Sequence, residues 1–209
     1  EALGDSASTL DGITYIFSVA ATLNRPVVVN MSQGDNLGPH DGTSLLERGI
    51  DNLLGGQGRA FVKSAGNEGS HNRHASGTVT AGATQQIRFN IPTGDTSPDT
   101  IDIWYPGADR FAFTIAPPGG SASATVNPGS TRTLNLGNGN SVFVDSVLND
   151  PNNNDNRIYV QISAGTAGAI ETGNWAINLT GVTVTNGSFH AWIERGGRVP
   201  QFLAPHLTN

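Results

Sequence analysis

The chain has no cysteine, little charge and no long apolar run. Without cysteine it cannot form disulfides, use a thiolate nucleophile or build a cysteine zinc site. Charged residues make up 13% of the chain, and the 11 lysines and arginines are scattered. The clustered cations that bind nucleic-acid phosphates or anionic membrane surfaces are therefore missing. No segment approaches the roughly 20 apolar residues that cross a bilayer. We expect neither nucleic acid nor membrane as a partner.

Glycine and proline are abundant instead, with 27 and 11 residues, and asparagine, threonine and serine are plentiful in the second half. This composition is typical of a turn-rich β protein. A length of 209 residues allows one domain or two. The sequence begins at Glu1 and has Met31 as its only methionine. We therefore expect that residues have been removed upstream and that the chain is an internal piece of a longer protein.

Residues 1–75 follow a helix, strand, helix, strand pattern. Apolar residues recur at three- and four-residue spacing in residues 10–23 and again in 45–54, which predicts two helices. Residues 27–31 are almost all apolar and mostly β-branched, as expected of a central strand covered on both faces, and residues 60–62 predict a second strand. This order predicts part of an α/β domain with a parallel sheet.

From about residue 76 the helical period disappears, and short alternating segments separated by turn residues take over. Each segment places its apolar side chains on one face of a strand. The inward sets are Ile101 and Ile103; Phe111, Phe113 and Ile115; Trp175, Ile177 and Leu179; and Phe189, Ala191 and Ile193. About eight to ten such strands predict an all-β antiparallel sandwich, jelly-roll-like, over residues 76–195.

The segments that follow the two predicted α/β strands stand out. Residues 30–34 read Asn-Met-Ser-Gln-Gly, and residues 64–69 read Ser-Ala-Gly-Asn-Glu-Gly. Ligands of open parallel sheets bind at the carboxyl ends of strands, and glycine lets a substrate backbone come close. Two adjacent strand ends of this kind predict a peptide-binding groove.

In this order, and separated by one helix, the two segments resemble the subtilisin-like serine proteases, or subtilases, in which N-x-S-x-G and A-G-N-E-G line the substrate cleft. The resemblance covers about residues 10–70. It implies an internal fragment of a serine endopeptidase that hydrolyses peptide bonds through an acyl-enzyme. It further implies a jelly-roll-like β domain inserted at residues 76–195 and a return to the protease domain at 196–209.

The resemblance also implies a role for each site residue. Asn67 donates its side-chain amide to the oxyanion, because a neutral amide N–H stabilises charge that develops on oxygen. The residues that flank the substrate are Ser32, Gln33, Gly34, Ser64, Ala65 and Gly66, with Glu68 near the floor of the pocket. The alternative for Asn67 is a left-handed turn residue. Gln33 and Asp35 depart from the family pattern, so pocket polarity does not carry over.

None of the three catalytic triad residues is expected in this chain. The family order is Asp, His, oxyanion Asn and then Ser, which places the first two before Glu1 and the nucleophile after Asn209. The chain alone is therefore predicted to be inactive. The Gly-Thr-Ser triplet that ends at Ser44 precedes the oxyanion Asn, so we interpret it as a helix cap and His40 as a loop histidine.

No cofactor or metal is expected. His71 and His74, with Glu68 nearby, have a spacing that a metal can use, but a solvated loop is the favoured interpretation. Residues 150–155 alternate oxygen-bearing side chains like a calcium loop. They lack the glycine at position six and the glutamate at position twelve. An ordinary polar turn is favoured there, with calcium left as the alternative.

Two other functions stay open. Residues 173–179 and 187–193 look like the last hairpin of jelly-roll modules in subtilases, with Trp175 and Phe189 toward the core and Trp192 on the outer face. A non-catalytic sandwich that binds carbohydrate or protein is the main rival, and a pseudoprotease scaffold is the third hypothesis. The peptidase hypothesis implies a peptide or protein substrate and a bacterial protein that is secreted or in the cell envelope. Cysteine absence fits this compartment or a reducing cytoplasm, and the oligomeric state stays open.

Overall fold

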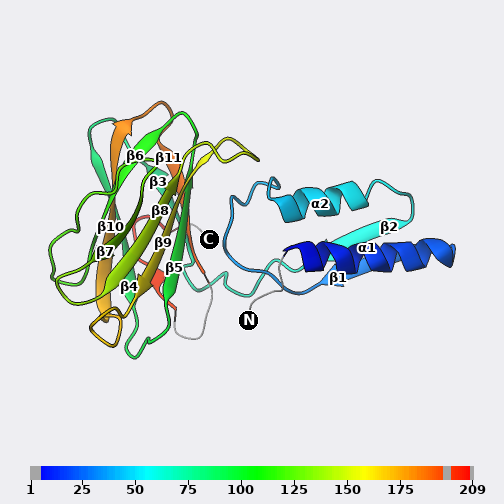
Figure 1. Ribbon diagram of the computed structural model, residues 1–209, viewed down its shortest axis with the longest axis horizontal. Helices are drawn as coiled ribbons and strands as arrows, with labels where there is room; N and C mark the ends of the chain where they lie inside the picture. The colour runs from blue at the N-terminus through cyan, green and yellow to red at the C-terminus, as the bar shows by residue number, and fades with distance from the viewer. Residues whose placement is uncertain (1–5, 195–198, 208–209) are drawn as a thin grey trace. The chain divides into compact units, whose positions relative to one another are not determined.

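A computed structural model of the chain describes residues 6–194 and 199–207, in two compact units. The first unit comprises Glu1–Asp35 and Pro39–Asn67, and the second comprises Asn36–Gly38 and Glu68–Asn209. We call them the α/β unit and the β unit. Figure 1 shows helices and the β1 and β2 strands in the former and a stack of strands in the latter. No helix among the described residues is both long and apolar enough to cross a membrane.

The α/β unit contains the four elements that the sequence pattern predicts. They are α1 (Ser6–Thr22), β1 (Val27–Met31), α2 (Leu45–Leu53) and β2 (Arg59–Lys63). The two strands are parallel, with pairs running from Val27 opposite Arg59 to Met31 opposite Lys63. This sheet has two strands in the described part of the chain, so a larger parallel α/β sheet is not established.

The helix α2 begins with a capping box. The backbone N–H of Glu47 donates to Ser44 Oγ at 3.3 Å, and the backbone N–H of Ser44 donates to Glu47 Oε2 at 3.1 Å. Both donors would otherwise lack a partner at the helix start. The helix-cap interpretation of Ser44 is confirmed, and its hydroxyl is committed to the backbone of its own helix.

Only one face of the parallel pair is covered. Ile13 and Phe17 of α1, Val29 of β1 and Ile50 of α2 form a small buried cluster on that face. On the opposite face Val28 is 65% exposed and Val62 is 51% exposed. The prediction that residues 27–31 are buried on both faces is therefore wrong for this structure, because no described residue of the α/β unit covers Val28.

The β unit is a sandwich of two antiparallel sheets, as predicted for an all-β unit. One sheet has the strand order β12-β4-β10-β6 and the other has the order β3-β11-β5-β9-β8-β7. The strands are β3 (His74–Thr78), β4 (Thr84–Ile91), β5 (Asp99–Tyr105), β6 (Arg110–Ala116), β7 (Thr131–Asn135), β8 (Ser141–Val147), β9 (Asn156–Ser163), β10 (Gly173–Thr183), β11 (Ser188–Ile193) and β12 (Gln201–Phe202).

Alternating apolar residues of both sheets meet in one core. All the inward sets predicted from alternation are at most 1% exposed. Trp175 buries its ring and satisfies its indole N–H by donating to the Glu171 carbonyl at 2.8 Å, as a buried tryptophan requires. Trp192 lies on the outer face, where its ring stacks with His74 and His190. The inward and outward placement predicted for this hairpin is confirmed.

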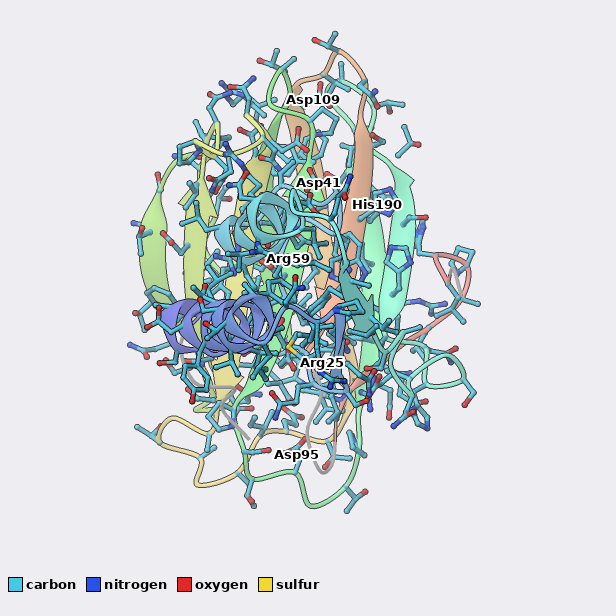
Figure 2. All side chains as sticks on the ribbon, turned by 90° about the vertical axis from the view of Figure 1, so that its right-hand side faces the viewer. Arg25, Asp41, Arg59, Asp95, Asp109 and His190 are labelled. Atoms are coloured by element: carbon cyan, nitrogen blue, oxygen red, sulfur yellow. The ribbon has the colours of Figure 1, made fainter. Side chains whose placement is uncertain are left out.

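A buried carboxylate fastens the turn between β10 and β11. Asp109 is fully buried and accepts the backbone N–H groups of Thr185, Asn186 and Gly187 at 2.5, 3.1 and 2.7 Å. Burial alone raises the pKa of Asp109, but these N–H donors outweigh it, so the pKa lies below its ordinary value. In Figure 2 Asp109 and Asp95 lie at opposite ends of the sandwich.

The end of the chain is held by the sandwich. The implied return to the protease domain predicts that residues 197–209 look unsupported in this chain by itself; of these, 197–198 and 208–209 lie outside the described residues. In the described part, β12 pairs with β4, Phe202 is fully buried, and Leu207 forms a bridge with Ala75. The expectation of an unsupported tail is wrong here, because an apolar ring enters the core where β4 leaves an open edge.

Three residues between β1 and α2 belong to the β unit. The backbone N–H of Asn36 donates to Glu194 Oε2 at 2.9 Å, and that of Gly38 donates to Asp102 Oδ2 at 2.9 Å. Asp102 is fully buried and also accepts from Trp104 Nε1 at 2.9 Å and from Arg157 Nε at 2.6 Å. We call residues 36–38 the strap.

Candidate functional site

The segments that follow β1 and β2 begin side by side. Met31 and Lys63 are the last paired residues of the parallel strands, and the backbone N–H of Ser64 donates to the Met31 carbonyl at 3.2 Å. Residues 32–34 and 64–66 leave the sheet at this edge. Ser32 and Gln33 are exposed, as are all three residues of 64–66, while Gly34 is half-buried. The structure thus brings together six of the eight predicted site residues.

A lysine that sequence reasoning missed lies between the two segments. Lys63 Nζ donates to the Ser64 carbonyl at 2.9 Å and lies 3.4 Å from Ser64 Oγ. A Cβ added to Gly34 would come within 2.9 Å of Lys63 Nζ. The absent side chain at Gly34 therefore makes room for the ammonium group. The signal in the sequence is a cation that directly follows the apolar residues Ala60, Phe61 and Val62.

Lys63 and Ser64 do not meet the requirements of a serine and lysine pair. A lysine that acts as a base needs burial in an apolar pocket, and both residues are exposed. Their contact also lies between neighbours in sequence. Lys63 instead places a positive charge beside the ends of the two strands, where it would attract negative charge on a ligand.

Asn67 is exposed just after this edge. The left-handed residue of the segment is Gly66, with φ of 91°, a conformation that glycine adopts without steric cost. The left-handed turn offered as the alternative for Asn67 is therefore at Gly66. The oxyanion role itself stays a prediction.

Glu68 is the first residue of the β unit after Asn67. Its carbonyl accepts the backbone N–H of His71 at 2.8 Å, and its carboxylate attracts the guanidinium of Arg73. The structure therefore places Glu68 with residues of the sandwich.

His71 and His74 have a spacing that a metal can use, but His74 pairs with His190 instead. His74 Nε2 lies 3.0 Å from His190 Nδ1, and the two rings are 4° from parallel. A hydrogen bond between imidazoles lies in the ring planes, so the pair lies edge to edge above Trp192. His71 takes no part in that pair. Groups of three or more His, Cys, Asp or Glu that could hold a metal are absent from the described residues.

Residues 150–155, for which a polar turn is favoured and calcium is the alternative, form a turn that folds on itself. Asp150 Oδ1 accepts the backbone N–H of Asn152 at 2.9 Å and its side-chain amide at 3.1 Å. The backbone N–H of Asp155 donates to Asn153 Oδ1 at 3.0 Å. These contacts are those of Asx turns, and they use oxygens that a calcium ion would need.

The described chain thus combines a parallel α/β pair with exposed strand ends and a large antiparallel sandwich. The solved structure of the CspB protease of Clostridium perfringens has the same fold, with a TM-score of 0.84 over 96% of this chain and 24% sequence identity. The match covers 41% of that protein, so this chain spans about two fifths of its length. No protein-family model matches the sequence, and no curated protein matches it.

These comparisons correct the family assignment. Membership of the subtilisin-like serine proteases, with an inserted jelly-roll domain, is not upheld, because no family model matches and a likeness at 24% identity carries the fold alone. The physical reason lies in the motifs, which are short. Their glycines and small polar residues also serve the backbone where any two parallel strands end. What stands is the fold shared with the CspB protease.

Proposed function

We propose that this chain forms part of a serine endopeptidase and supplies one wall of its peptide-binding cleft together with the oxyanion donor. The observation that carries the proposal is the pairing of Met31 with Lys63, since it sets two exposed, glycine-containing strand ends at one edge. The likeness to the CspB protease supports the same class of reaction.

The roles follow from chemistry at that edge. An extended peptide lies along residues 32–34 and 64–66, whose backbone groups leave the sheet beside one another. Asn67 then donates its amide N–H to the carbonyl oxygen as that oxygen becomes negative during attack. The Lys63 ammonium adds a fixed positive charge beside the edge. None of these groups is a nucleophile, so they stabilise and orient rather than react.

The proposal assigns the nucleophilic serine and its base to residues outside this sequence. The open face of β1 and β2, with Val28 and Val62 exposed, supports further covering structure because parallel sheets are normally covered on both faces. The match to 41% of a longer protease is consistent with this.

Covalent labelling tests the proposal. The full-length protein is treated with a fluorophosphonate, which phosphonylates activated serines with loss of fluoride, and the modified residue is identified by mass spectrometry. We expect one labelled serine outside the 209 residues and loss of peptide hydrolysis in proportion to labelling. The 209-residue chain by itself is expected to show no hydrolysis and no label, because an activated nucleophile needs an adjacent base. A label on Ser44, or a peptidase that is active yet takes no label, would overturn it.

A further inference from the structure

A groove opens on the β unit beside the last strands of its two sheets. It is lined by residues 117–124, by residues 135–138 and by Glu171, and its cavity has a volume of about 530 Å³. Residues 117–124 follow β6, the last strand of one sheet, and residues 135–138 begin at the end of β7, the last strand of the other. Most of the lining residues are exposed. Ligand sites typically have volumes of about 300–1,000 Å³, so the groove is large enough to be one.

A network of asparagine side chains fixes Glu171 in the groove. Asn140 is 1% exposed, and its amide donates to the carbonyls of Ala164 and Ala169 at 3.0 and 2.7 Å. Its Oδ1 accepts the backbone N–H of Glu171 at 3.0 Å and the side-chain amide of Asn138 at 3.0 Å. The Asn138 amide also donates to Glu171 Oε2. The carboxylate is therefore held in place before a ligand arrives, which lowers the ordering cost of binding.

Glu171 supplies the only charge among the described residues that line the groove. Its Oε2 accepts from Asn138, whereas Oε1 accepts no hydrogen bond from any described residue. One open oxygen suits the compact ammonium group of a lysine, because the planar guanidinium of arginine is bound best by two oxygens together. Glu171 is half-buried, so solvent screens such a charge pair less than on an open surface. The groove therefore favours a ligand with one primary ammonium group.

The backbone along one wall of the groove is unpaired on its outer side. The backbone N–H of Ser123 donates to the Ile115 carbonyl at 2.8 Å, and Val126 forms a bridge with Phe113, so this segment runs beside β6. Residues 121–122 are exposed and make no backbone hydrogen bond with any described residue. Unpaired N–H and carbonyl groups at the edge of a sheet are a template for an added strand. This wall can therefore pair with an extended peptide.

We propose that the groove binds an extended peptide that carries a lysine, with the lysine ammonium on Glu171 Oε1. The peptide backbone lies along residues 121–122 and pairs with their free N–H and carbonyl groups. Main-chain hydrogen bonds then supply affinity, and Glu171 selects the side chain. All the residues involved belong to the β unit, so the site does not depend on the proposed peptidase activity.

An NMR titration of the 209-residue chain tests the site. The probe is the peptide acetyl-Thr-Val-Lys-Val-Thr-amide, and the same peptide with norleucine or arginine in place of lysine is the comparison. We expect the amide signals of residues 119–124 and 135–138 to shift, with Kd on the order of 10⁻⁴–10⁻³ M, because one short strand and one charge pair bind weakly. The norleucine peptide should bind at least about tenfold more weakly, since a hydrogen bond to a charged group is lost. The arginine peptide should lie between the two.

Matched variants separate the charge of the groove from its shape. Glu171→Gln keeps an oxygen for Asn138 and removes the charge, so it should weaken the lysine peptide about tenfold and leave the norleucine peptide unchanged. Gly137→Leu should abolish binding of all three peptides. A Cβ at Gly137 meets no atom within 4 Å and its backbone is not left-handed, so the new side chain occupies the groove without strain. Gly12→Leu, in equally open space on α1, is the control and should bind as the unmodified chain does.

Three results would overturn the site. The first is the absence of any shift in these signals at about 5 mM lysine peptide, well above the expected Kd. The second is equal binding of the lysine and norleucine peptides, or equal binding of the lysine peptide by Glu171→Gln and the unmodified chain, because Glu171 would then select no cation. The third is unchanged binding in Gly137→Leu, or shifts confined to other residues, which would place the peptide elsewhere on the chain.

Discussion

Met31 and Lys63 end two parallel strands as register partners, with the N–H of Ser64 bonded to the Met31 carbonyl at 3.2 Å. Because both strands stop at the same level, the segments that follow begin beside each other. A one-residue slip would place Ser64 against a different carbonyl and turn every side chain of the strand over. The proposed cleft therefore depends on the register of this one pair.

Replacing Asn67 by Ala in the full-length protein should lower kcat by about 10²–10³ and change KM much less, because an oxyanion donor acts mainly in the transition state. The measurement is steady-state peptide hydrolysis. Asn52→Ala is the matched control, an exposed asparagine on α2, and should leave kcat unchanged. If Asn67→Ala retains nearly full kcat with an unchanged melting temperature, Asn67 does not stabilise the oxyanion.

Replacing Asp109 by Ala should destabilise the β unit by about 3 kcal/mol, since three N–H groups of the turn lose a charged acceptor. Because the pKa of Asp109 is lowered, its stabilising effect is present above the ordinary carboxyl pKa and is lost as pH falls through the folded value. Urea unfolding at pH 7 and at pH 3 measures both effects. Asp145→Ala, which removes one hydrogen bond from Thr131, should cost much less; equal costs would show that the turn does not depend on Asp109.

Asp99→Asn should stabilise the chain at neutral pH. The folded pKa of about 8 lies above the ordinary 3.8, so the folded state binds the proton more tightly. The unmodified chain then loses stability as pH rises between these two values. The gain in Asp99→Asn should grow over that range to the order of a few kcal/mol. Thermal melting at pH 5 and pH 8 tests this, and a variant with the same pH slope as the unmodified chain would contradict it.

A fragment that starts at the boundary of the β unit, Glu68, is expected to fold by itself. Residues 68–209 should give a β-type circular dichroism spectrum and a cooperative melt, whereas residues 76–195 should be less stable. The shorter span removes the buried Phe202 and the start of β3, and loss of a large buried aromatic side chain costs about 3–5 kcal/mol. Equal melting temperatures would show that β12 contributes nothing to the sandwich.

Local periodicity accounts for the part of the fold that could be predicted. Trp175, Ile177 and Leu179 alternate along one strand, and the alternation alone states which face is buried. The capping box at Ser44 is equally local, since its two partners lie three residues apart. The sequence also predicts that the ends of β1 and β2 lie side by side, because two apolar strands joined by one helix form a parallel pair.

Features that depend on contacts far apart in sequence could not be predicted. Arg73, Asp95 and Asp99 come from different segments, and nothing near each residue indicates that the three share one end of a sheet. Phe202 stands in a short segment without alternation, so its place against β4 is set by the open edge of that sheet. The role of Lys63 depended on the absence of a side chain at Gly34, twenty-nine positions before it.

The strap has a consequence for how the two units can be separated. Because Asn36 and Gly38 satisfy Glu194 and the buried Asp102 of the sandwich, a single cut between Asn67 and Glu68 leaves those carboxylates with fewer donors. In a chimaera that exchanges only residues 68–209, the strap and the carboxylates that it contacts come from different proteins. The sandwich is thus a discontinuous module, and exchange or inheritance of the whole unit requires matched changes at two places in the gene.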